Sequence, residues 1–379
     1  MTYNWQLPDW PNFSYDLSVI FDELTEFSQQ IGRVSGIIDA LPEGTQLETL
    51  IDVMVSEAIK TSEIEGEYLS RADVMSSIRN NLGLGNEPEA KDVRAVGIAE
   101  LMVSVRQQYA APLSEETLFE WHRMLMKGNE KIKSGIWRQH AEPMQVVSGR
   151  MDRPTVHFEA PPSETVPGQM DEFIDWFNRT APSGSHPIKQ APVRSALAHL
   201  YFESIHPFED GNGRIGRAIS EKALSQGVGR PVLLTLSKAI EAQKSQYYDA
   251  LMAAQRMNEI TDWLKYFTEM CLRAQSDAES QVEFTLQKAK FFDQFKDKLN
   301  ERQLRVVRRM MDEGPHGFEG GMSAGKYASI AKTSKPTATR DLQELLALSA
   351  LKVTGGGRST RYWLPFENAK PKQKNKQKY

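Results

Sequence analysis

The sequence has one cysteine, Cys271, among 379 residues. A lone thiol excludes an intrachain disulfide framework and a multi-cysteine zinc site, and it fits a reducing, cytoplasmic setting. Long apolar runs are also missing, since the most apolar short run, 231–236, is far below the ~18 residues of a membrane span. The opening residues, MTYNWQLPDWPNF, carry no basic residue and no apolar core, unlike a signal peptide. We therefore expect a cytoplasmic protein without a membrane partner.

The chain as a whole has no excess of positive charge, because its net charge is -4. The average hides an asymmetry: residues 288–379 contain 20 Lys and Arg against 9 Asp and Glu, a net charge of +11. An acidic body followed by a basic C-terminal segment predicts that this segment contacts an anion, often nucleic acid.

Apolar residues recur at helical spacing through most of the chain, as at Leu50, Ile51, Met54 and Ala58. The clearest strand signal is Met144–Phe158, where two β-rich runs flank a turn. We therefore predict a mostly α fold in which a helical core carries one β-hairpin.

The C-terminal segment 300–366 has its own pattern. Helical runs are followed by two short strand-like runs around a glycine triplet, and Ser334 and Pro336 suit the start of a helix near Lys335. This order predicts a winged helix-turn-helix. Residues 276–299 have the spacing of a linker helix, and the lysine-rich residues 367–379 have the composition of a basic disordered tail.

The most informative string is HPFEDGNGRIGR, residues 206–217. Pro207 disfavours a helical conformation at His206, so an incoming helix should end there. Gly211 and Gly213 allow a tight loop, and a new helix begins near Arg214. A glycine-bearing loop that leads into a helix N-terminus favours a bound phosphate.

Charged and titratable side chains in the same string suit phosphoryl-type chemistry. His206 can act as a general base near neutral pH. Asp210 offers the hard oxygen that Mg²⁺ prefers. Arg214 and Arg217 lie three residues apart, on one helix face, and can bind phosphate oxygens.

This string matches the pattern His-x-Phe-x-Asp-Gly-Asn-Gly-Arg-x-x-Arg, and in this it resembles the defining motif of the Fic family (filamentation induced by cyclic AMP). The resemblance implies transfer of AMP from ATP to a Ser, Thr or Tyr hydroxyl of a target protein. It implies His206 as the base and Asp210 as the Mg²⁺ ligand. The implied ATP-phosphate ligands are Gly211, Asn212, Gly213, Arg214, Gly216 and Arg217.

A second resemblance lies upstream, in TSEIEG at residues 61–66. It fits the family's inhibitory pattern, Ser/Thr-x-x-x-Glu-Gly/Asn, through Thr61, Glu65 and Gly66. The resemblance implies that Glu65 pairs with Arg217 and blocks seating of the γ-phosphate. It also implies that Glu65 can serve removal of AMP, by positioning water.

Further positions follow from the same resemblance. The hairpin resembles the flap that pins a target segment, through Val146, Val147, Ser148 and Gly149. Tyr247 and Gln255 stand where the family contacts adenine. A homodimer is a candidate partner, because dimerisation often regulates the family.

The sequence thus predicts a Fic-type helical core with a hairpin flap and a C-terminal winged helix. One alternative function is a DNA-binding regulator that senses nucleotide in the same pocket, with DNA contacted through residues 300–366. Another is transfer of a different group, since the motif does not choose the donor. The predicted parts are an N-terminal helical region (1–88), the Fic core (89–275), the linker helix (276–299), the winged helix (300–366) and the tail (367–379).

Overall fold

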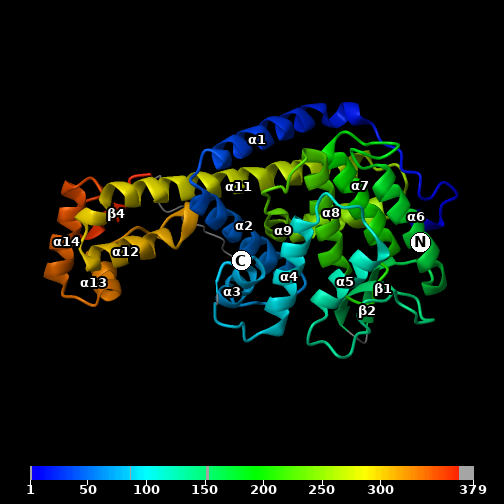
Figure 1. Cartoon of the computed structure of the whole chain (residues 1–379), viewed down its shortest axis with the longest axis horizontal. Coiled ribbons are helices and arrows are strands. Elements are labelled where there is room, and N and C mark those ends of the chain that lie inside the picture. The colour runs from blue at the N-terminus through cyan, green and yellow to red at the C-terminus, as the bar shows by residue number, and fades with distance from the viewer. Residues whose placement is uncertain (1, 86, 151–152, 367–379) are drawn as a thin grey trace. The chain divides into compact units, whose positions relative to one another are not determined.

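A computed structural model describes residues 2–85, 87–150 and 153–366 of the chain. It divides into two compact units, of which unit 1 comprises Met1–Gly36 and Leu50–Ala278 and unit 2 comprises Ile37–Thr49 and Glu279–Tyr379. Most of the ribbon in Figure 1 is helical, as the sequence predicted. The helices and strands are α1 (Phe21–Asp39), α2 (Glu43–Ile64), α3 (Arg71–Asn81), α4 (Val93–Gln107), α5 (Glu115–Leu125), β1 (Gln145–Arg150), β2 (Arg153–Glu159), α6 (Val166–Arg179), α7 (Ala191–Ile205), α8 (Asn212–Val228), α9 (Leu236–Ala242), α10 (Lys244–Ala254), α11 (Thr261–Phe295), α12 (Glu301–Met311), α13 (Ala324–Ala331), α14 (Lys335–Ala347), β3 (Lys352–Thr354) and β4 (Arg361–Trp363).

Helix α7 forms the centre of unit 1, because every one of its residues is buried. Pro192 lies in its first turn, where a missing backbone N–H costs nothing. Arg194 is buried as well, and its guanidinium lies 4.3 Å from the ring centroid of Phe177 and donates to the Phe177 carbonyl. The loop that follows α7 therefore starts from a fixed, fully packed helix.

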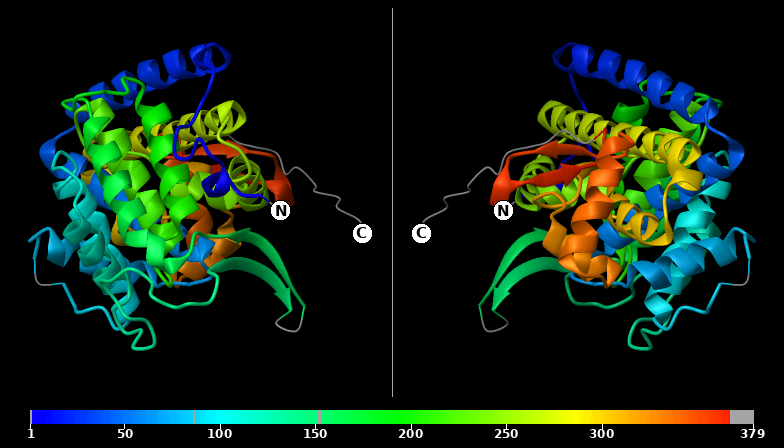
Figure 2. Two further views of the ribbon diagram at one scale, coloured as in Figure 1. Left: turned by 90° about the vertical axis from the view of Figure 1, so that its right-hand side faces the viewer. Right: turned by 90° about the vertical axis from the view of Figure 1, so that its left-hand side faces the viewer.

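The expected hairpin is confirmed as an antiparallel pair of strands, β1 and β2, with a bulge between Val146 and Val147. Figure 2 shows it extending away from the helices of unit 1. Its tip, residues 151–152, lies outside the described residues. At its base, Trp5 Nε1–H donates to the Glu159 carbonyl at 2.8 Å.

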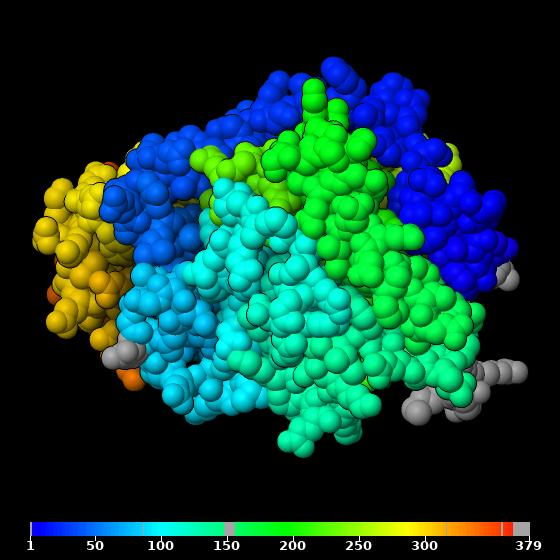
Figure 3. Space-filling model, turned by 45° about the vertical axis from the view of Figure 1, so that its right-hand side comes forward, coloured from blue at the N-terminus to red at the C-terminus, as the bar shows by residue number. Residues whose placement is uncertain are grey.

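The N-terminal segment packs on the outside of unit 1, beside α6 (Figure 3). Asn4 is fully buried and its Nδ2 donates to Ser204 Oγ at 2.9 Å. The ring of Trp10 meets that of Tyr201 edge-on, with centroids 5.1 Å apart. Polar and aromatic contacts thus attach this segment to α7.

Unit 2 contains α12, α13 and α14 followed by the β3–β4 hairpin, the order that the sequence predicted for residues 300–366. The buried Asp341 accepts a hydrogen bond from the Tyr327 hydroxyl at 2.9 Å. The winged-helix assignment stays a prediction, and the tail at 367–379 lies outside the described residues.

The linker helix was expected to be a separate element at 276–299, and here the structure differs. Helix α11 runs without interruption over Thr261–Phe295. Its sequence contains neither glycine nor proline, and Ala274, Ala278 and Val282 continue one buried stripe. Nothing in that stretch ends a helix, so no helix begins at 276. The division between the two compact units nevertheless falls inside α11, between Ala278 and Glu279.

Helix α2 is fastened to α9 by a buried carboxylate. Glu57 is 6% exposed, and its two carboxylate oxygens accept from the Ser237 backbone N–H at 2.9 and 3.0 Å. Burial raises the pKa of Glu57 to about 7 in spite of these bonds. Burial and the neighbouring Glu57 likewise raise the pKa of Glu221 to about 8. Glu57 thus anchors α2 to the N-terminal end of α9, about two helical turns before Glu65, which directly follows the last residue of α2.

This burial predicts a pH dependence of stability. Glu57 binds a proton more tightly in the folded chain, with a pKa of about 7, than in the unfolded chain, where it is 4.5. Its stabilising contribution is therefore complete below pH 4.5 and is lost as the pH rises through about 7. In the native protein this loss should lower the free energy of unfolding by on the order of 2 kcal/mol between pH 4.5 and about 7, measured by urea denaturation. The variant Glu57→Gln should not show this decline. Glu63→Gln, on the surface of the same helix, should keep the native slope; identical slopes for native protein and Glu57→Gln would refute the assignment.

Candidate active site

The loop between α7 and α8 is shaped by backbone geometry and by one asparagine. His206 ends α7 in the left-handed region, with φ 50°, and its N–H donates to the Phe202 carbonyl at 2.9 Å. Gly211, with φ 83°, precedes α8. Asn212 Oδ1 accepts from the Phe208 N–H at 2.9 Å, and its Nδ2 donates to the Phe208 carbonyl at 2.8 Å. The side chain of Asn212 therefore spans the loop and fixes its width.

Below the loop, Phe208 is fully buried among aromatic rings. Its centroid lies 4.1 Å from that of His122 and 4.9 Å from that of Trp137. His122 Nδ1 accepts from the Gly135 N–H at 3.0 Å. Burial lowers the pKa of His122 to about 4, so this ring is neutral at physiological pH and packs as an aromatic group.

Arg138 fastens the same loop from the side, and the sequence analysis did not find it. Its Nε donates to the His206 carbonyl at 2.8 Å, and its backbone N–H donates to the Pro207 carbonyl at 2.9 Å. Its Nη atoms reach the Pro161 carbonyl and Ser163 Oγ beyond the hairpin. Burial lowers the pKa of Arg138 to about 10, which still leaves it charged near neutral pH.

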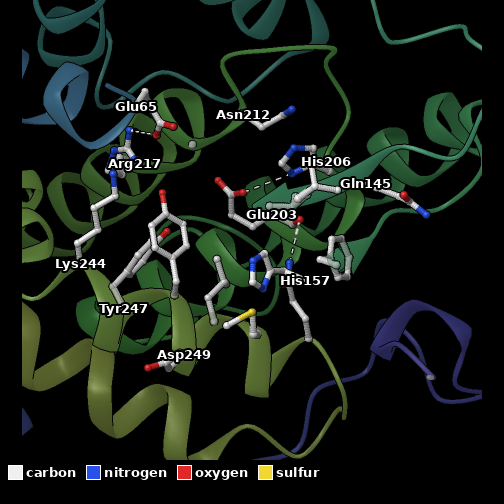
Figure 4. Close-up of a pocket in the computed structure, with 18 of the residues that line it drawn as sticks. Glu65, Gln145, His157, Glu203, His206, Asn212, Arg217, Lys244, Tyr247 and Asp249 are labelled. Carbon is white, nitrogen blue, oxygen red and sulfur yellow. Dashed lines mark hydrogen bonds and ion pairs between the residues drawn. The ribbon is translucent and has the colours of Figure 1, made fainter. Parts of the chain in front are cut away.

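One cavity of about 640 Å³ gathers most of the predicted site residues (Figure 4). The predicted residues that line it are Glu65, Val146, Val147, His206, Asp210, Gly211, Asn212, Gly213, Arg217, Tyr247 and Gln255. Ser148 and Gly149 continue strand β1. Segments from α2, the hairpin, α8 and α10 therefore meet at one place in unit 1.

Arg217 is 3% exposed and is held by the end of α2. Its Nη2 lies 2.6 Å from Glu65 Oε1, and its Nε donates to Thr61 Oγ1 at 2.7 Å. Burial lowers the pKa of Arg217, but the charge of Glu65 and the nearby tyrosines raise it above its usual value. Gly66, with φ 81°, turns the chain immediately after Glu65. The carboxylate and Arg217 thus form a close, partly buried ion pair.

Arg214 makes a parallel contact that the sequence analysis missed. Its Nη1 lies 2.8 Å from Glu67 Oε2, and its Nη2 lies 3.7 Å from Asp210 Oδ1. Arg214 is 4% exposed and does not line the cavity. Glu67 follows Glu65 by two residues, so one short segment pairs with both arginines of the motif: Glu65 with Arg217 and Glu67 with Arg214.

Gly216 was expected among the phosphate ligands, but it faces α7 and not the cavity. A Cβ there would lie 2.5 Å from Glu203 Oε1 and 3.3 Å from His199 Cε1. Gly213 differs, because a Cβ there would lie 2.5 Å from Glu65 Oε1, at the wall of the cavity.

On the α10 side, the cavity is lined by Tyr247 and Gln255, the two residues that were expected to contact adenine. Tyr247 is 2% exposed, and its hydroxyl lies 2.6 Å from His199 Nε2, while burial raises its pKa well above the usual value. Gln255 Nε2 donates to the Glu203 carbonyl at 3.1 Å. Lys244, which also lines the cavity, donates from Nζ to the Ile64 carbonyl at the end of α2.

The described residues contain no cluster of three or more His, Cys, Asp or Glu side chains suited to a metal ion. Asp210 is a single half-exposed carboxylate in the cavity wall, and its Oδ1 accepts from the Gly211 N–H at 2.6 Å. Over the part of the chain that is described, no helix is both long and apolar enough to cross a membrane.

Comparison with known proteins gives matches to two family models. Residues 112–224 match the Fic/DOC family, and residues 3–84 match a domain of unknown function, DUF4172. The chain is 25% identical over 236 residues to a protein adenylyltransferase Fic of Drosophila willistoni, an alignment that covers 59% of this chain and 43% of that protein. The chain thus spans less than half the length of this relative.

Two solved structures share the fold. A Fic family protein from Desulfovibrio desulfuricans G20 has a TM-score of 0.54 at 20% identity, over 95% of this chain and 99% of that one. A Fic domain containing signaling protein from Bacteroides thetaiotaomicron has a TM-score of 0.52 at 18% identity, over 69% of this chain and 97% of that one.

The packing of Gly216 gives a testable prediction. Gly216→Ala adds a Cβ that must displace the buried Glu203 carboxylate, so we expect a loss of about 1–3 kcal/mol of unfolding free energy in urea denaturation. The control is Gly168→Ala in α6, where nothing lies within 4 Å of an added Cβ. Because alanine favours a helix, that change should be neutral or stabilising. Equal stability of the two variants would contradict the close approach of Glu203.

Proposed function

Because the chain carries a Fic/DOC family domain at residues 112–224, we propose that it is a protein adenylyltransferase. It would move AMP from ATP to a Ser, Thr or Tyr hydroxyl of a target protein. The observation that carries this proposal is the one cavity where His206, Asp210 and the first residues of α8 converge. The printed name of the Drosophila willistoni relative supports the same activity.

In this reaction the hydroxyl oxygen of the target attacks the α-phosphorus of ATP. A P–O bond forms to the target as the bond to the leaving pyrophosphate breaks. His206 lines the cavity and takes the proton that the hydroxyl loses. Its backbone is fixed on both sides, by Phe202 and by Arg138, which keeps the base in place for the transfer.

The phosphates would lie at the N-terminus of α8. Gly211, Asn212 and Gly213 line the cavity there, and the N–H groups and the positive dipole end of a helix N-terminus favour an anion. Arg217 reaches this place from the second turn of α8. Arg214 lies behind it and becomes available to phosphate when Glu67 leaves.

Asp210 fits a role as the Mg²⁺ ligand. Mg²⁺ at nucleotide sites usually binds one or two carboxylates together with substrate phosphates, and Asp210 is one exposed carboxylate beside the phosphate position. When bound, the ion supplies positive charge that offsets the phosphates. Asp210 itself is kept at the loop by the Gly211 N–H.

The remaining walls suit the base and the target. Tyr247 and Gln255 present an aromatic edge and an amide for adenine. Val146 and Val147 line the cavity from the hairpin, and Val147 is 50% exposed, so an extended target segment can pair along β1.

Glu65 would act as a brake on this reaction. It occupies the Arg217 guanidinium, the group that a terminal phosphate needs, and the two anions cannot share it. The same carboxylate can position water for removal of AMP from a modified target.

Labelling with ATP that carries a radioactive α-phosphate, in the presence of Mg²⁺, tests the activity and its brake. We expect Glu65→Gly to label itself or proteins of a cell lysate about tenfold or more above the native chain, because Arg217 is released. Adding His206→Ala should abolish the label, because the base is removed.

Glu63→Gly is the matched control, since Glu63 ends the same helix but pairs with Lys60. It should label like the native chain. If Glu65→Gly binds ATP in calorimetry yet transfers nothing in lysate, with any nucleoside triphosphate, the site is a sensor and the transferase proposal is wrong.

A second function, DNA contact, is favoured by the exposed face of α14. Ala338, Leu342 and Leu345 of this helix are buried in unit 2. Lys335 and Arg340 lie on the exposed side, with Thr339 and Gln343. A basic and polar face on the second helix of a helix-turn-helix pattern suits the major groove of double-stranded DNA.

We therefore expect the double change Lys335→Ala and Arg340→Ala to weaken duplex binding, measured by fluorescence anisotropy over a series of salt concentrations. The slope of log affinity against log salt should fall by about 2, because two contacts with DNA phosphates are lost. Lys290→Ala on α11 is the control and should keep the native slope. Binding that is absent, or independent of salt, would remove DNA as a partner.

A further inference from the structure

Glu203 is a buried carboxylate that lies beside the proposed catalytic base. It belongs to the last turn of α7, is 5% exposed and lines the cavity. Its Oε2 lies 3.5 Å from His206 Nδ1, the contact drawn in Figure 4. Within the described part of the chain, Nδ1 of His206 has no hydrogen-bond partner, although it is buried. Glu203 is thus the acidic group that faces Nδ1 of the His206 ring.

The surroundings hold the Glu203 carboxylate in one place. Its Oε1 fits against Gly216, where any Cβ would come within 2.5 Å. Its backbone carbonyl accepts from Gln255, and the helix around it is packed on all sides. Burial raises the pKa of Glu203, but the contact with His206 and the positive charge of Arg217 bring it below its usual value. The carboxylate is therefore ionised where it meets the ring.

The His206 ring has little other freedom. The main chain on either side of it is tied to Phe202 and to Arg138, and Pro207 fixes the next residue. Rotation about the side-chain bonds is the freedom that remains. A small rotation about these bonds would bring Nδ1–H within hydrogen-bonding distance of the Glu203 carboxylate, which lies 3.5 Å away. That bond would leave Nε2 without a proton, as a general base requires.

We propose that Glu203 is a positioning residue for His206, a role that rests on the proposed transferase function. It holds the tautomer that has Nδ1 protonated, and so Nε2 faces the cavity as the acceptor. When the target hydroxyl gives its proton to Nε2, the imidazolium that forms has a carboxylate beside it. Glu203 stays ionised throughout, and His206 returns the proton to water after the product leaves. Glu203 and His206 would therefore act as a carboxylate–histidine pair in which both residues come from the C-terminal end of α7.

The test uses the Glu65→Gly chain as the reference, with labelled ATP as substrate. Glu203→Gln keeps the shape and one acceptor but removes the charge, and we expect kcat to fall on the order of tenfold to a hundredfold. The KM for ATP should stay within about twofold, because Glu203 does not bind the phosphates. Glu203→Leu also removes the acceptor, and its kcat should fall further. Glu172→Gln, at the exposed surface of α6, should change neither constant.

A second readout does not depend on activity. In chains with ¹⁵N-labelled histidine rings, the His206 signals are assigned by their loss in His206→Ala. The reference should show Nδ1 protonated and Nε2 unprotonated, and Glu203→Leu should shift the ring toward the opposite tautomer. Thermal unfolding of Glu203→Gln identifies a variant that fails to fold.

The outcomes separate the two proposals. If the reference transfers no AMP, the proposed function fails, and the ring signals alone decide the role of Glu203. If the reference is active but Glu203→Gln keeps its kcat, or Glu203→Leu keeps the native tautomer, Glu203 does not position His206. A fall in stability with an unchanged tautomer would assign Glu203 to packing only.

Discussion

A guanidinium cannot hold a carboxylate and a phosphate in the same place, and the function that we propose depends on this competition. Glu65 takes Arg217, and Glu67 takes Arg214. Both arginines are almost completely buried, whereas Glu65 and Glu67 keep 30% and 27% of their side chains exposed, so each pair is only partly shielded from water. Because the two carboxylates lie two residues apart, at the end of α2, a single displacement of this segment would release both cations for a nucleotide.

The strength of the competition depends on how firmly α2 is held. Glu65 is part of the same chain as Arg217, so its effective concentration is set by the anchoring of its helix and not by solution conditions. Glu57 fastens α2 to the start of α9, and Lys244 binds the Ile64 carbonyl one residue before Glu65. In the proposed mechanism, these contacts set how much binding energy a nucleotide must supply to displace Glu65.

The sequence predicted the parts of the site that are contiguous in the chain. The loop between α7 and α8 could be predicted from the string at residues 206–217, because its proline and glycines act on the backbone at fixed local spacing. Glu203 precedes His206 by one helical turn, a spacing that brings side chains together on a helix, but the sequence does not tell which face of α7 is turned to the cavity. Arg138 carries no such local signal, since all of its partners come from elsewhere in the fold. Where a separate linker helix was expected, helical spacing continues without a glycine or proline, so the sequence did not show that one helix, α11, runs through the division between the two units.

Gly213 and Gly216, two of the three glycines of α8, each leave a space that a carboxylate fills. The space that Gly213 leaves empty is filled by the Glu65 carboxylate in this structure, at the place where a phosphate would approach Arg217. The space beside Gly216 is filled by Glu203, which faces His206. A side chain at Gly213 would move the Glu65 carboxylate away from Arg217, and one at Gly216 would move the Glu203 carboxylate away from His206. The absence of side chains at Gly213 and Gly216 is therefore required by these acidic neighbours, which couples the first turns of α8 to residues outside the motif.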